Sequence, residues 1–89
     1  MNSLYTPDIR NYVFTRDWPK GLIIDIVEYE THLGFRFYRD NFIQFGSEAQ
    51  RQIAMTVKEV MEKLRGDGIP CYMEKMERVP NGNGSGLAT

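Results

Sequence analysis

Two carboxylates and an imidazole alternate along one stretch of the chain, at Glu28, Glu30 and His32. Alternate residues of an extended strand point to the same face, so these three side chains would lie together. Carboxylate oxygens and an imidazole nitrogen are suitable ligands for a divalent cation. The same pattern also fits a polar, solvated strand end, and His32 falls where a turn is expected. The second interpretation is preferred, so no metal and no other cofactor is predicted.

Aromatic residues and arginines are interleaved in segment 35–39 (FRFYR). Aromatic rings stack on bases and guanidinium groups hold phosphates, so an exposed strand of this kind could bind single-stranded nucleic acid through Arg36, Tyr38 and Arg39. The formal net charge of −1 gives the chain no general attraction to a polyanion. Nucleic-acid binding is therefore the alternative hypothesis for function and not the leading one.

The four residues Gly34 to Phe37 (GFRF) resemble part of one motif of the RNA-recognition motif family. The resemblance is confined to G-F-x-F, because Leu33 stands where that family has a basic residue. That fold also requires a helix after its first strand, which the order of elements predicted here lacks. The chain is not assigned to the family on this basis.

Nucleophilic catalysis has few residues to draw on. Cys71 is the only cysteine and His32 the only histidine, and no spacing brings them together. An activated thiol needs a neighbouring base or a helix N-terminus, so Cys71 is interpreted as a buried apolar side chain. No P-loop, G-x-G-x-x-G or H-E-x-x-H pattern occurs. The sequence therefore argues against an enzyme without deciding the question.

Bulk composition is that of an ordinary globular domain, with 42% hydrophobic and 26% charged residues in 89. We expect a single domain over residues 1–79 and a flexible, glycine-rich tail over residues 80–89. The longest apolar run, Leu22 to Ile24, is too short to cross a bilayer, so no membrane association is expected. A single cysteine excludes an internal disulfide framework, and this favours a reducing, cytoplasmic location.

The clearest element is a helix that begins near Gly46 and ends before Pro70. Apolar residues recur at three-and-four spacing and form one stripe. Ser47 with Gln50 fits a capping box at the start, and Gly66 fits a left-handed residue at the end. The residues of the apolar stripe are Ala49, Ile53, Val57, Val60, Met61 and Leu64.

Strands are predicted at 21–30, 35–39, 42–45 and 71–79 from β-branched and aromatic residues between turn signals. The first 20 residues are left open, either as a helix that starts at Thr6 and Pro7 or as a strand over 11–15. The predicted fold is α+β: a two-layer sandwich with an antiparallel four-stranded sheet (β-β-β-α-β) and one long amphipathic helix on one face.

The strand 21–30 is apolar on both of its faces, although the predicted helix would cover only one of them. The leading hypothesis is therefore a small protein–protein interaction module that binds a protein partner or forms a homo-oligomer through the other sheet face. Free sheet edges also invite strand addition by a partner. The predicted binding residues are Ile23, Val27, Tyr29, Arg36, Tyr38 and Arg39.

Overall fold

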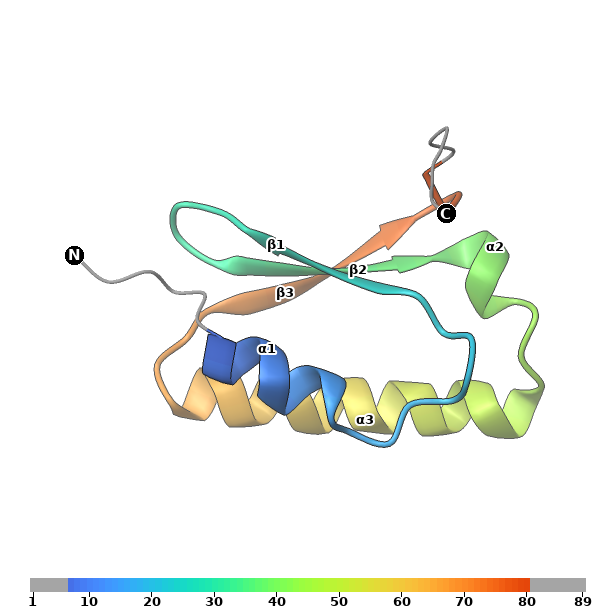
Figure 1. Cartoon of the computed structure of the whole chain (residues 1–89), viewed down its shortest axis with the longest axis horizontal. Helices are drawn as coiled ribbons and strands as arrows, with labels where there is room; N and C mark the ends of the chain where they lie inside the picture. Colours follow the sequence, from blue (N-terminus) through green and yellow to red (C-terminus); the bar gives the residue numbers. More distant parts are fainter. Residues whose placement is uncertain (1–6, 81–89) are drawn as a thin grey trace.

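A computed structural model describes residues 7–80, which form an α+β structure with a three-stranded sheet and one long helix (Figure 1). Thr6, the predicted helix cap, and nearly all of the predicted tail at 80–89 lie outside the described residues. The elements in chain order are α1 Pro7–Phe14, β1 Ile24–Glu28, β2 Leu33–Tyr38, α2 Arg39–Phe42, α3 Ser47–Gly66 and β3 Cys71–Met76.

The sheet has the order β1-β2-β3, with β1 antiparallel to β2 and β3 parallel to β2. The predicted α+β class is confirmed, but the predicted four-stranded antiparallel sheet is wrong, because the described residues contain three strands in a mixed sheet. The strands are also shorter than the predicted segments 21–30 and 71–79. Since α3 carries the chain back along the sheet after β2, the strand that follows α3 runs in the same direction as β2.

The missing strand is the one predicted at 42–45. This segment instead begins with the last residue of helix α2 and continues as a turn, in which Phe45 donates its backbone N–H to the carbonyl of Phe42 over 3.1 Å. Phe42 and Phe45 are three residues apart and both pack against the core, whereas Ile43 between them is 59% exposed. A strand would have placed Phe42 and Phe45 on opposite faces, so burying both aromatic rings favours the helical turn.

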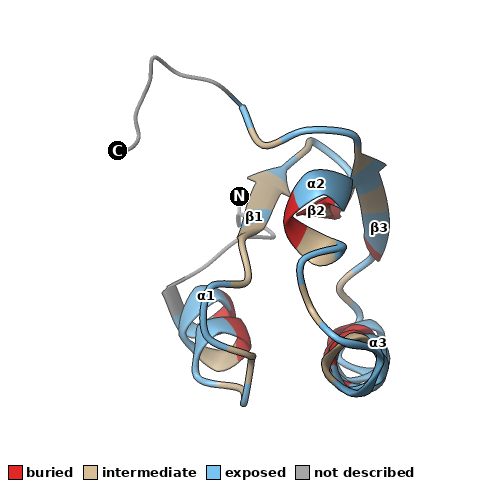
Figure 2. Cartoon of the chain, turned by 90° about the vertical axis from the view of Figure 1, so that its right-hand side faces the viewer, coloured by how far each residue is buried: buried red, intermediate tan, exposed pale blue. Residues whose placement is uncertain are grey.

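Helices α1 and α3 lie on the same face of the sheet, α1 beneath β1 and α3 beneath β3 (Figure 2). Of the two interpretations of the first 20 residues, the helix is correct, because Pro7–Phe14 forms α1. The core fills the space between these helices and the inner face of β2. Its buried members are Ile9, Val13, Leu33, Phe35, Phe37, Ile53, Val57, Val60, Met61, Leu64 and Cys71.

The ends of α3 differ by one or two residues from the predicted capping pattern. Gly46 is the N-cap, and it makes no side-chain capping bond. Gln50 does not complete a capping box, because its side-chain amide donates to the backbone carbonyls of Phe42 and Phe45. The left-handed residue after the helix is Gly68, with φ of 84°, and not Gly66. Gln50 thus fixes the α2–α3 connection rather than the helix start.

Candidate functional site

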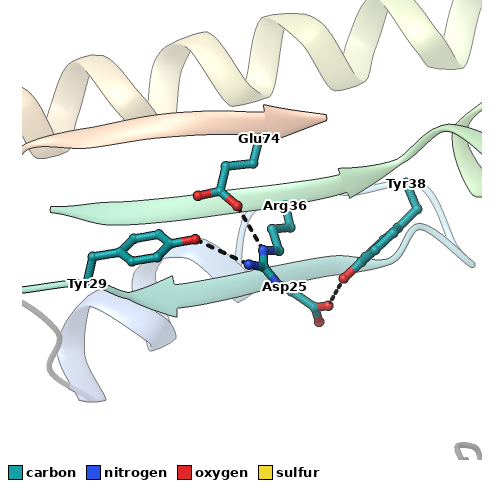
Figure 3. Close-up of polar contacts among 5 residues, drawn as sticks. All are labelled: Asp25, Tyr29, Arg36, Tyr38 and Glu74. Carbon is teal, nitrogen blue, oxygen red and sulfur yellow. Dashed lines mark hydrogen bonds and ion pairs between the residues drawn. The ribbon is translucent and has the colours of Figure 1, made fainter. Parts of the chain in front are cut away.

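The outer face of the sheet, opposite α1 and α3, carries a network of polar side chains (Figure 3). Arg36 on β2 donates through Nε to Oε1 of Glu74 on β3 over 2.8 Å, and through Nη2 to the hydroxyl of Tyr29 over 3.2 Å. These hydrogen bonds and the ion pair raise the pKa of Arg36. Hydrogen bonds, from Arg36 first and Tyr29 second, lower the pKa of Glu74. The guanidinium is thus neutralised within the sheet itself.

Gly34 makes room for this network. A Cβ atom at position 34 would lie 2.5 Å from Oε2 of Glu74 and 2.8 Å from a ring carbon of Tyr29. Any larger residue at this position would therefore displace one of the two partners of Arg36. The glycine in the GFRF stretch has a packing role on the outer face.

Tyr38 belongs to the same face of β2 but is 2% exposed. Its hydroxyl donates to the carboxylate of Asp25 on β1. Burial first, and then the bond to Asp25, raise the pKa of Tyr38 to about 12. The chain after β3 is tied back beside this residue, where Asp40 donates its backbone N–H to the carbonyl of Glu77. A ring held in this way is unavailable for stacking on a base.

The structure separates the six predicted binding residues into two groups. Ile23, Val27 and Tyr29 are half-buried, and with Arg36 and Tyr38 they belong to the outer face or its border. Arg39 is exposed and lines a groove on the inner side of β3 instead. Arg36, Tyr38 and Arg39 therefore do not form one basic, aromatic surface, which leaves the nucleic-acid hypothesis with little support from their geometry.

The residues considered as metal ligands, Glu28, Glu30 and His32, do not continue along one strand, because β1 ends at Glu28. Within residues 7–80 no three His, Cys, Asp or Glu side chains gather closely enough to hold a metal ion. The ring of His32 stacks on Tyr29 at 4.7 Å between centroids and meets the edge of Tyr72 at 5.1 Å. The Arg65 guanidinium lies over Tyr72 at 5.6 Å. His32 thus belongs to an aromatic cluster that closes one end of the outer face.

A groove of about 630 Å³ lies between β3 and α3 and is bounded at one end by α2. A tight turn joins α3 to β3, and the two elements diverge from that turn toward α2 (Figure 1). The groove is lined by seven apolar residues, by three cationic ones, by one tyrosine and by one glutamate. The full lining is Phe37, Tyr38, Arg39, Phe42, Ile53, Ala54, Val57, Lys58, Met73, Lys75, Met76 and Glu77.

Strand β3 is the free edge of the sheet on the side of this groove, because the strand order ends with it. Its first carbonyl, that of Cys71, is occupied by the Arg65 guanidinium at 2.7 and 3.1 Å. Met73 follows on the open part of the strand and is 44% exposed. An unprotected strand edge beside an apolar groove is a surface on which another chain can bind.

Sequence reasoning did not identify the groove, although it recognised that free sheet edges invite strand addition. Lys58, Met73 and Lys75 were not named as binding residues, because their proximity depends on β3 lying parallel to β2 over α3. One signal was present: Met73 and Met76 lie in a strand that also carries Glu74 and Lys75, a mixture typical of an edge strand.

No family model, curated protein or solved structure matches this chain. Among residues 7–80, none of the helices has the length and apolar character needed to cross a membrane. The function of the chain is therefore inferred from its own side chains and backbone.

Proposed function

We propose that this chain is a small protein-interaction module with no catalytic activity of its own. The observation that carries the proposal is the apolar groove of about 630 Å³ along the free edge of β3. Apolar surface in contact with water favours association, and an unpaired strand edge supplies hydrogen bonds to a partner's backbone. Together they offer both affinity and a defined orientation for a bound protein. The single, buried Cys71 is consistent with a cytoplasmic site of action.

Two protein-binding surfaces are candidates, and they differ in the partner they favour. The groove suits a foreign chain, whereas the outer sheet face suits a second copy in contact through Ile23, Val27 and Tyr29. The outer face has less to offer, because Arg36 and Tyr38 already have partners in Glu74 and Asp25. The groove is therefore the preferred surface, and self-association through the outer face is the second candidate.

Light scattering over a concentration series tests these two surfaces. Stable monomers support the groove as a site for a foreign partner. A dimer that Val27→Asp disrupts, while Met73→Asp leaves it intact, assigns self-association to the outer face. The reverse pattern assigns it to the β3 side. Circular dichroism of each variant confirms that the fold is retained.

A protein-interaction role would be wrong if neither surface engages a protein. The direct measurement is hydrogen exchange of the isolated chain in the absence and presence of a cell extract that contains its natural partners. Slower exchange at Met73 and Lys75 with extract, reversed by Met73→Asp, supports the groove. Unchanged exchange at these residues and at Val27 contradicts the proposal.

A further inference from the structure

We propose that the β3 groove binds an extended, acidic segment of another protein, which adds to the sheet as a strand beside β3. This inference rests on the proposed function and specifies the partner by its chemistry. Three independent features of the same edge carry it: unpaired backbone groups, an apolar floor and an excess of cations at the rim.

The backbone of β3 is open at two residues. Leu33 donates its N–H to the carbonyl of Pro70, and Leu33 is the register partner of Cys71. In a parallel ladder with this register, the N–H and C=O groups of the even-numbered residues of β3 bond to β2. The N–H and C=O groups of Met73 and Lys75 therefore point away from the sheet. Arg65 occupies the outward carbonyl of Cys71, so strand addition would begin at Met73.

The side chains of the same two residues reach the groove. Met73 pairs with Phe35 and Lys75 with Phe37, so all four side chains share the inner face of the sheet. An added strand would place every second side chain on this face, beside Met73 and above Ala54 and Lys58 of α3. Apolar residues at alternate positions of the partner would therefore be accommodated by the groove. The floor they would contact consists of Phe37, Phe42, Ile53, Val57 and Met73.

The charges around the groove select an acidic partner. Arg39, Lys58 and Lys75 line it, against one carboxylate, that of Glu77. Across residues 7–80, these three cations form no ion pair. Asp or Glu residues between or beside the partner's apolar positions would complement this rim and raise the rate of association.

A second copy of the chain fits this edge poorly. An antiparallel pair of β3 strands related by a two-fold axis would place the same side chains on both partners. Lys58 and Lys75 of each copy would then approach the cations of the other, and like charges oppose such an interface. A small anionic amphiphile would use the floor and the cations but would leave the N–H groups of Met73 and Lys75 unused. An acidic extended peptide uses all three features.

Selection from a displayed library of random 12-residue peptides on the folded protein tests the proposal. The expected peptides carry Val, Ile, Leu or Phe at alternate positions with Asp or Glu nearby. Their synthetic versions should slow hydrogen exchange at the Met73 and Lys75 amides. Dissociation constants for the wild type and each variant are then measured by fluorescence anisotropy.

Two variants with matched controls separate the features. Met73→Pro removes an outward N–H without removing a bond to β2, and edge strands tolerate proline. It should weaken binding roughly tenfold or more relative to Met73→Leu. Lys58→Glu with Lys75→Glu should also weaken binding roughly tenfold or more, whereas Lys20→Glu, at an exposed position before β1, should have no effect. If Met73→Pro loses the fold, N-methylation of alternate peptide amides tests the same hydrogen bonds.

Each remaining outcome overturns the inference in a distinguishable way. One outcome is that peptides bind with an affinity that Met73→Pro, N-methylation and charge reversal all leave unchanged. This result would agree with a protein-interaction module but would exclude the addition of an acidic strand. If no peptide is enriched on the wild-type protein relative to the Lys58→Glu, Lys75→Glu variant, a peptide-binding groove is excluded. Binding of decanoate that the Lys58→Glu, Lys75→Glu protein loses, without peptide selection, assigns the groove to small amphiphiles. A solution mass that increases with protein concentration through contacts of β3 assigns the groove to a second copy of the chain.

Discussion

Arg36 of β2 and Glu74 of β3 form an ion pair across two parallel strands, with Nε and Oε1 2.8 Å apart. Both residues belong to the outer face of the sheet, and their side chains are 34% and 26% exposed. Tyr29 from the end of the β1–β2 hairpin completes the arrangement. The network connects β2 and β3, the strands before and after α3, to the turn of the β1–β2 hairpin. Its polar groups are paired, so the outer face has little need of a partner, in contrast with the groove.

The first prediction concerns the pH dependence of this pair. The pKa of Glu74 lies below its ordinary value of 4.5, so its contribution to stability is present above about pH 4.5 and is lost as the pH falls through the folded-state pKa. Glu74→Gln should lower the melting temperature at pH 7, and the difference should shrink as the pH falls below 4.5. Glu59→Gln, at an exposed position on α3, is the control. A difference that does not decrease at any pH below 4.5 would contradict the assignment.

A second prediction concerns Tyr38. Tyr38→Phe keeps the buried ring and removes the hydroxyl that donates to Asp25, so it should cost about 1 kcal/mol in chemical denaturation. Tyr38→Asp should unfold the chain, because it deletes a ring that is 2% exposed and introduces a charge. Tyr72→Phe, at a tyrosine that is 55% exposed, should be close to neutral.

Ionisation of Tyr38 gives an independent measurement. Its pKa is raised from 10.0 to about 12, so the folded state favours the neutral phenol. The corresponding stability is fully present below pH 10 and decreases as the pH rises toward 12. Ultraviolet titration should show one tyrosine fewer ionising near pH 10 in the wild type than in denaturant. An identical titration of folded and denatured protein would show that Tyr38 is accessible.

Asn41 carries the third prediction. This buried amide accepts from the backbone N–H of Ile23 over 2.9 Å and donates to the carbonyl of Gly21 over 3.0 Å. It therefore connects α2 to the turn before β1, where Gly21 has φ of 92°. Asn41→Ala leaves both backbone groups without their partner and should cost about 1 to 2 kcal/mol by urea denaturation. Gln44→Ala, at an exposed neighbour, should cost clearly less, and equal losses would indicate a general effect on α2.

These residues also show how far the sequence determines the fold. The apolar stripe on α3 recurs from Ala49 to Leu64, so local periodicity was enough to predict that helix. The segment 42–45 offered only two aromatic residues, and its pattern fits a strand until the burial of both rings is known. No local pattern predicts the role of Asn41, because its partners, Gly21 and Ile23, lie 20 and 18 residues away.

The candidate site was less predictable than the fold for the same reason. Alternation assigned Arg36 and Tyr38 to one face of β2, in agreement with the register with β1 and β3. It gave no information on Glu74, which neutralises Arg36 from 38 residues away. The groove depends on the parallel position of β3, which could not follow from an expected antiparallel sheet. Long-range pairing thus set the limit of sequence reasoning.

The fourth prediction compares two residues that are register partners, Phe35 and Met73. Phe35 is 2% exposed in the core, whereas Met73 is 44% exposed at the groove. Phe35→Ala should cost about 3 to 5 kcal/mol, which is most of the stability of a domain of this size. Met73→Ala should cost less than about 1 kcal/mol in urea denaturation. A large loss for Met73→Ala would show that the groove is closed by that side chain in solution.

The fifth prediction uses Cys71 as a reporter of opening. Its side chain lies in the core beneath the start of β3, and burial raises the pKa of the thiol despite the nearby Arg65. Only the thiolate reacts with a disulfide reagent, so labelling of the folded chain at pH 8 should require opening. The rate should be far below that of the chain in denaturant. Tyr38→Phe, expected to cost about 1 kcal/mol, should accelerate labelling roughly fivefold.

Peptide binding extends the same assay to the groove. A strand added at Met73 and Lys75 would hold β3 against the sheet, so a selected peptide at saturating concentration should slow the labelling of Cys71. The control is the charge-reversed protein with Lys58→Glu and Lys75→Glu, in which the peptide should leave the rate unchanged. Labelling of the free wild-type chain as fast as in denaturant would instead show that Cys71 is exposed, and that the start of β3 does not pack as the structure has it.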